Sequence, residues 1–145
     1  MSDFFKRHWE AKSKMPSFQL LEGRNTRMNR ILPEGLAAKY HSAFIEVSTL
    51  DSEMNELNPP RIDLIEIDVE GNEYQVLLGA MNMIKKFRPI LVIKVIDTNL
   101  QVHKQSSKEP ISLLLGLGYK TIDLKTQKPV SILEKIETDI ICYPI

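Results

Sequence analysis

Three acidic residues stand close together in the middle of the chain, directly after a short apolar run. The run covers 62–67, and the acids that follow it are Asp68, Glu70 and Glu73. Beyond Gly71 the apolar residues recur at helical spacing, so the pattern predicts a buried strand, a tight turn and an amphipathic helix. In open α/β sheets, ligands bind at the carboxyl ends of strands. Chemistry is therefore expected at this turn.

The three acids allow two interpretations. Carboxylates before and within the first turn of a helix accept hydrogen bonds from unpaired amides and offset the positive end of the helix dipole, which explains one or two of them. A third acid so close adds like-charge repulsion, which a ligand, a cation or a basic partner would relieve. A calcium-binding loop is not indicated, because Gly71 is the fourth residue from Asp68 and an EF-hand needs glycine at the sixth. We expect no metal site.

The composition excludes several classes of protein. The 145 residues are 43% hydrophobic and 26% charged, which is typical of a globular domain. Nineteen basic residues balance nineteen acidic ones, so no nucleic-acid partner is expected. Cys142 is the one cysteine, and no apolar run approaches the roughly 20 residues of a membrane helix. We expect a cytoplasmic protein without a transmembrane segment.

The N-terminal residues are predicted to form a separate helix at 1–14. Phe4, Phe5 and Trp9 alternate with charged residues, and Ser2 is a suitable N-cap. Such an amphipathic helix packs on its own domain or lies on a membrane surface.

A second apolar run at 90–96 follows the first with a single helix between them. This arrangement predicts a βαβ unit with a right-handed crossover, and strands apolar on both faces predict cover by helices on both sides. The elements predicted after it are a helix and two strands, at about 109–117, 119–124 and 139–143. The predicted fold class is α/β: a mainly parallel sheet with helices on both faces and an antiparallel C-terminal strand, in one domain over 1–145.

A polar segment at 97–108 follows the second run and carries Asn99 and His103. The carboxyl ends of parallel strands meet at the same edge of a sheet. We therefore expect this segment to approach Asp68 and Glu70.

Five stretches of this sequence together resemble one known family. They are Val47–Asp51, Ile62–Glu73, Val76–Ala80, Arg88–Val92 and Gly118–Lys120. Their residues are similar to those of the FkbM-type methyltransferases.

The resemblance covers about 17–145 and implies a class I, Rossmann-like methyltransferase fold. It also implies S-adenosylmethionine as methyl donor and O-methylation of a hydroxyl on a sugar or secondary metabolite, so the partner would be a small-molecule or glycan acceptor. On this resemblance Asp68 and Glu70 line the mouth of the active site and are candidate catalytic residues.

Three further residues are candidates for the same site. His103 titrates near neutrality and is a natural base, although a histidine on a surface loop has the same sequence signature. Glu73 and Asn99 are the candidate substrate-binding residues.

The sequence departs from the family in its glycines. None of the six forms the glycine-rich turn after an N-terminal strand that holds the methyl donor. We therefore expect a truncated enzyme that resembles the C-terminal half of the family and binds S-adenosylmethionine weakly or not at all by itself. Three states fit: a fragment that pairs with a separate N-terminal half, a non-catalytic interaction module, or an enzyme active alone or as a homo-oligomer.

A second departure is an exchange of charge. The family has lysine where this chain has Glu66, and glutamate where it has Lys94. An isolated charge in a covered strand is very costly, so these two residues are predicted to form a buried ion pair on neighbouring strands.

Overall fold

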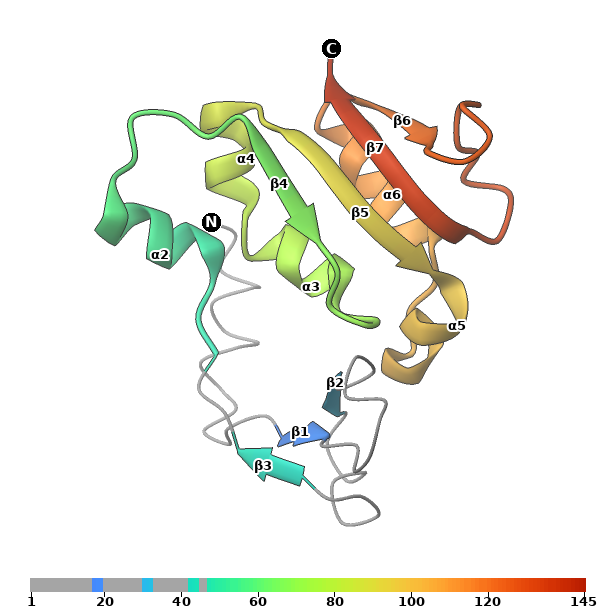
Figure 1. Cartoon of the computed structure of the whole chain (residues 1–145), viewed down its shortest axis with the longest axis horizontal. Helices are drawn as coiled ribbons and strands as arrows, with labels where there is room; N and C mark the ends of the chain where they lie inside the picture. Colours follow the sequence, from blue (N-terminus) through green and yellow to red (C-terminus); the bar gives the residue numbers. More distant parts are fainter. Residues whose placement is uncertain (1–16, 20–29, 33–41, 45–46) are drawn as a thin grey trace. The chain divides into compact units, whose positions relative to one another are not determined.

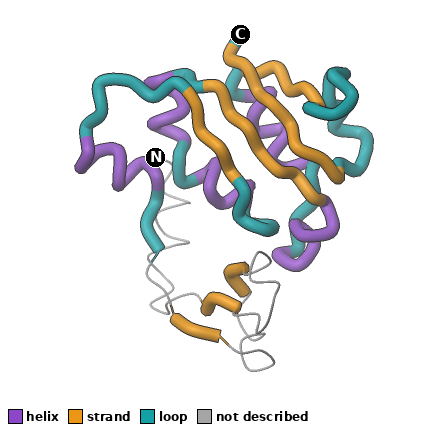
Figure 2. Tube along the Cα trace, viewed as in Figure 1, coloured by secondary structure: helices purple, strands orange, loops and turns teal. Residues whose placement is uncertain are grey.

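The computed structural model of the chain is shown in Figures 1 and 2. It describes residues 17–19, 30–32, 42–44 and 47–145. The chain divides into two units, Met1–Ser48 and Thr49–Ile145. The helix expected at 1–14 lies outside the described residues, and the single domain over 1–145 stays a prediction.

The first unit contains a three-stranded antiparallel sheet. Its central strand β1 pairs with β2 on one side and β3 on the other. The strands are Ser17–Gln19, Arg30–Leu32 and Ser42–Phe44.

The second unit is built on a four-stranded mixed sheet in the order β4-β5-β7-β6. The strands β4 to β7 are Leu64–Ile67, Ile90–Ile96, Tyr119–Asp123 and Glu137–Pro144. β4 and β5 are parallel, as predicted, whereas β7 lies antiparallel between β5 and β6. The α/β class and the antiparallel C-terminal strand are confirmed, but the sheet is not mainly parallel: one of its three strand pairings is parallel and two are antiparallel.

Three helices lie behind this sheet in Figure 1: α3 (Glu73–Leu78), α4 (Met81–Phe87) and α6 (Lys108–Gly116). Burial along β5 alternates accordingly. Leu91, Ile93 and Val95 are fully buried, and the side chains between them are partly exposed. The expected helices on the second face are not among the described residues, so that part of the fold stays a prediction. No helix of the described part is long and apolar enough to cross a membrane.

The single helix expected after the turn is two helices, α3 and α4, because a side chain from elsewhere caps the second one. Asp51 lies in α2 (Leu50–Leu57), and its carboxylate accepts hydrogen bonds from the backbone N–H of Asn82 and of Met83 at 3.0 and 2.8 Å. A carboxylate at this place satisfies amides that begin a new helix. The chain direction therefore changes at Gly79 and Ala80.

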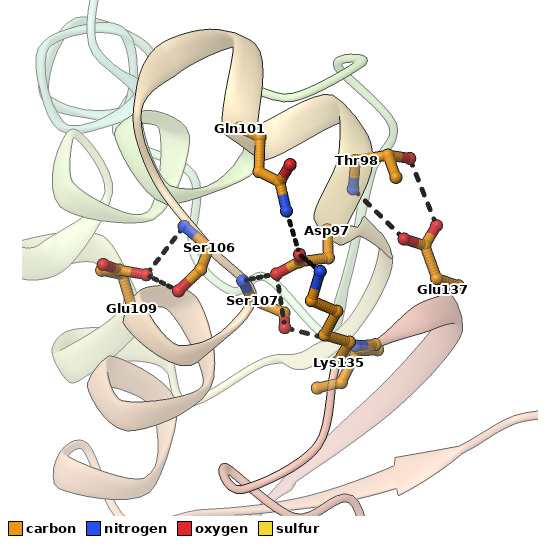
Figure 3. A network of polar contacts seen from close by, with 9 residues as sticks. Asp97, Thr98, Gln101, Ser106, Ser107, Glu109, Lys135 and Glu137 are labelled. Carbon is orange, nitrogen blue, oxygen red and sulfur yellow. Dashed lines mark hydrogen bonds and ion pairs between the residues drawn. The ribbon is translucent and has the colours of Figure 1, made fainter.

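The polar segment after β5 folds into two short helices, α5 (Asp97–Leu100) and η3 (Gln101–His103). Asp97, which is buried, anchors them (Figure 3). Its Oδ1 accepts from the backbone N–H of Ser107 at 2.8 Å, and its Oδ2 accepts from Nε2 of Gln101 at 2.7 Å. These bonds, that of the Ser107 amide foremost, hold the pKa of Asp97 below its ordinary value. The position of α5 and η3 thus depends on one ionised carboxylate.

The substitution Asp97→Asn is expected to lower the free energy of unfolding by about 1.5–3 kcal/mol at neutral pH, since it weakens hydrogen bonds to a charged group. The folded-state pKa lies below the ordinary value of 3.8, so the stabilisation is complete above that value and is lost as the pH falls through the folded pKa. Urea denaturation at about pH 7 and about pH 3 should therefore show a smaller difference between the two proteins in acid. The exposed Asp139, changed to Asn, is the control. An equal loss for both variants at neutral pH would contradict the anchoring role.

Candidate functional site

The turn between β4 and α3 has an unusual backbone that its neighbours hold in place. Glu70 has a φ of 51° and Gly71 a φ of 103°, both in the left-handed region. Side chains other than glycine adopt such angles at a cost of order 1 kcal/mol, so the surrounding structure must hold them there. The carboxylate of Glu73, which is 2% exposed, accepts from the backbone N–H of Gly71 at 3.0 Å. The turn is therefore tied to the start of the helix that follows it.

Glu73 is itself an unusual group. Burial raises the pKa of its carboxyl, although amide hydrogen bonds oppose the shift. Its second oxygen, Oε2, is buried and has no hydrogen-bond partner among the residues that the structure describes. The candidate substrate-binding residue thus lies under the turn and not on its surface.

Gly71 allows two backbone segments to touch. A Cβ atom at this position would lie 2.6 Å from the carbonyl oxygen of Asn99. Only glycine fits so close an approach. The turn after β4 therefore packs directly against α5, which follows β5.

Lys94 joins the two carboxylates of the turn. Its Nζ lies 2.8 Å from Oε1 of Glu70 and 3.2 Å from Oδ1 of Asp68. The other oxygen of Glu70 accepts from Nδ2 of Asn99 at 2.8 Å. The hydrogen bond to Glu70, and secondarily that to Asp68, raises the pKa of Lys94.

These contacts give the two carboxylates different surroundings. The side chain of Glu70 is 12% exposed and uses both oxygens, whereas that of Asp68 is 50% exposed. The ammonium of Lys94, at 34%, also reaches solvent. A hydrogen-bond acceptor and a donor thus stand side by side at the carboxyl edge of the sheet.

The predicted pair between Glu66 and Lys94 is wrong, and the strand register explains why. Glu66 lies opposite Val92, and Lys94 is two residues farther along β5. From there the lysine reaches past the end of β4 to the turn. Glu66 is exposed and makes no ion pair with any described residue, so it has no burial cost that a partner must offset.

His103 lies at the same edge. Its Nε2 is 3.3 Å from Nδ2 of Asn72, the residue just before α3. The structure therefore brings Asp68, Glu70, Asn99 and His103 together around the turn, as the parallel arrangement of β4 and β5 predicts. Their catalytic and substrate-binding roles stay predictions.

Sequence reasoning missed Lys94 and Asn72 as members of this cluster. Lys94 stands out in the sequence because it is the one charge in its apolar run. The strand register, which places it beside the turn, was not visible there. Among the described residues, no three histidine, cysteine or acidic side chains are grouped so as to hold a metal ion.

An open hollow lies elsewhere, between α3 and α6. It is lined by Tyr74, Lys108, Glu109, Ser112 and Leu113. The carboxylate of Glu109 is already engaged by the backbone N–H and hydroxyl of Ser106, at 2.9 and 2.6 Å. None of the lining residues belongs to the turn, so the candidate site remains at the carboxyl edge of β4 and β5.

Replacing Gly71 by alanine is expected to destabilise the protein by about 1–3 kcal/mol, because the new methyl group meets the backbone of Asn99 and the φ value disfavours any side chain. Gly116→Ala is the matched control. No atom lies within 4 Å of a Cβ there, so that change should be neutral or stabilise by about 0.5–1 kcal/mol. Chemical denaturation of both variants measures the difference. Equal stabilities would mean that the turn does not depend on this close approach.

Three comparisons with known proteins give a single match, which is to a family model. No curated protein and no solved structure matches the chain. The model of the methyltransferase FkbM domain matches residues 1–121, which is most of the sequence. The chain therefore belongs to the FkbM methyltransferase family.

Proposed function

We propose that the carboxyl edge of β4 and β5 forms the acceptor side of an S-adenosylmethionine-dependent O-methyltransferase. The acceptor would be a hydroxyl on a small molecule or glycan, such as a sugar or a secondary metabolite. The observation that carries the proposal is the half-exposed carboxylate of Asp68, held at a strand end beside Lys94. Family membership supports methyl transfer as the chemistry.

S-adenosylmethionine, when bound, supplies a methyl group on a positively charged sulfur. The described residues fit the side of a site that faces this methyl group, because the exposed carboxylate of Asp68 attracts a positive charge. They do not supply a backbone cradle for the rest of the molecule. The glycine of the turn, Gly71, faces the carbonyl of Asn99 and is not open to a ligand.

Asp68 is the proposed base. An acceptor hydroxyl must lose its proton as its oxygen gains the methyl group, and a positioned carboxylate receives that proton. Glu70 is proposed to hold Lys94 and Asn99 in place, since each of its oxygens accepts a hydrogen bond from one of them. Asn99 keeps its second amide hydrogen and stays a proposed substrate ligand.

His103 and Glu73 have narrower proposed roles. The amide of Asn72 lies 3.3 Å from Nε2 of His103, so this nitrogen can take a proton from an acceptor only when Asn72 turns away. Glu73 would contact a substrate only if the turn opened, because its side chain is buried.

A methyl-transfer assay tests the proposal. Labelled S-adenosylmethionine and a panel of hydroxylated acceptors would be supplied to the full chain, alone and with a separately expressed donor-binding half. The Asp68→Asn variant should lose about 100-fold or more of the rate, which is the usual contribution of a general base. Glu66→Gln is the control, since this exposed acid lies two residues before Asp68, on β4, and makes no ion pair with a described residue. No transfer under either condition would overturn the proposal.

Binding of the methyl donor is a separate prediction. The isolated chain should bind S-adenosylmethionine or S-adenosylhomocysteine weakly or not at all, because few fixed hydrogen bonds would offset the ligand's loss of freedom. Isothermal titration measures this directly. Micromolar binding that disappears in Asp68→Ala would instead support an enzyme that works by itself.

A non-catalytic interaction module is the second candidate, and one strand favours it. β4 is an edge strand of the sheet as described, and Leu64 on it is 56% exposed. Edge strands with exposed apolar side chains pair readily with other chains. The methyl-transfer assay separates the two candidates.

A further inference from the structure

We infer that Lys94 determines the acceptor class, and that Asp68 and Lys94 together bind a vicinal diol. Asp68 would accept a hydrogen bond from the hydroxyl that is methylated, and Lys94 would donate one to the oxygen of its neighbour. The methylation step in this statement rests on the proposed function. The recognition of the diol does not, because it depends only on the two side chains.

The first support is the place of Lys94 in the sheet. It lies on β5 beyond the residue that pairs with the end of β4, because Ile67 is opposite Ile93. Its ammonium therefore projects past β4 to the turn and contacts Asp68 at 3.2 Å.

The second support is that Glu70 fixes the ammonium. The 2.8 Å contact between Lys94 and Glu70 is the shorter of the two ion pairs, and Glu70 is held in turn by Asn99. Glu70 is largely buried, and its left-handed backbone adds a further restraint. Lys94 is thus positioned before any ligand binds, which reduces the entropy lost on binding.

The third support is the free capacity of the two exposed groups. An ammonium has three N–H donors, and the described hydrogen-bond partners of the Lys94 ammonium are the two carboxylates of the turn. One donor remains for a ligand. Asp68 is half exposed and can accept further hydrogen bonds, since each carboxylate oxygen has two lone pairs.

A hydrogen-bond acceptor next to a hydrogen-bond donor selects among ligands. A neutral polyol suits both groups, because its hydroxyls donate hydrogen bonds to the carboxylate and accept one from the ammonium. Two neighbouring hydroxyls can use both at once, and a lone hydroxyl or two distant ones can use only one. On methylation, a C–O bond forms at the first hydroxyl, its proton passes to Asp68, and the electrons of the broken C–S bond stay on the sulfur of the methyl donor.

A pair of isomers tests the spacing requirement without any methyl donor. Catechol carries two adjacent hydroxyls, and resorcinol carries the same two hydroxyls farther apart. Nuclear magnetic resonance titration of the full chain should show catechol shifting the amide signals of Asp68 and Gly71 and the side-chain amide of Asn99. Resorcinol should bind about tenfold more weakly, as expected for one missing hydrogen bond to a charged group.

Variants of Lys94 show whether it is the source of that preference. Lys94→Met should bring catechol binding down to the resorcinol level, and Lys94→Arg should keep part of the preference because it keeps charge and donors. Lys120→Met is the matched control, since Lys120 is an exposed lysine on β6. The Gly71 amide signal without ligand reports whether the turn of each variant is intact. Asp68→Asn, which preserves side-chain size, is a second variant expected to weaken the binding of catechol.

The outcomes are distinct from those of the methyl-transfer assay. Equal affinity for the two isomers, or a catechol preference that persists in Lys94→Met, overturns the diol inference even if methyl transfer is found. A preference that depends on Lys94 supports it even if no methyl transfer occurs, in which case the proposed function fails alone.

Discussion

The contact between Gly71 and the backbone of Asn99 is the constraint on which the candidate site depends. It joins the residues that follow β4 to those that follow β5, and it does so through main-chain atoms, which cannot move independently of their strands. The side chains of Lys94, Glu70 and Asn99 then meet because their backbones are already close. The polar contacts on the surface refine a geometry that packing has set, and a weak surface ion pair can therefore be well ordered here.

The difference between the two turn carboxylates lies in their burial and not in their chemistry. Asp68 and Glu70 are nearly the same group, two residues apart. One directly follows a strand and is half exposed, while the other occupies a left-handed position where each of its oxygens accepts a hydrogen bond. A pair of similar acids in one turn thus yields one group that is open to solvent and one that is largely buried and held by its partners.

Much of this arrangement was accessible from the sequence, for identifiable reasons. The apolar runs 62–67 and 90–96 predicted parallel strands because both have the length of a strand and a single helix lies between them. The acids after the first run predicted the edge of the sheet where the cluster lies. The pairing of Lys94 was predicted wrongly, since register between strands is a tertiary property that one-dimensional spacing does not contain. The split of α3 from α4 was missed for a similar reason: the capping group, Asp51, comes from a distant helix.

The position of β7 has a consequence for how the sheet forms while the chain is being synthesised. β5 and β6 are not neighbours in the sheet, and each pairs with β7, the strand that follows both of them in the chain. A nascent chain that ends before Glu137 contains the βαβ unit but has no sheet partner for β6. The inner edge of β5 stays open for the same interval, as an unpaired strand edge that attracts other chains. β7, which is made after both β5 and β6, is therefore the strand that joins the two sides of the sheet.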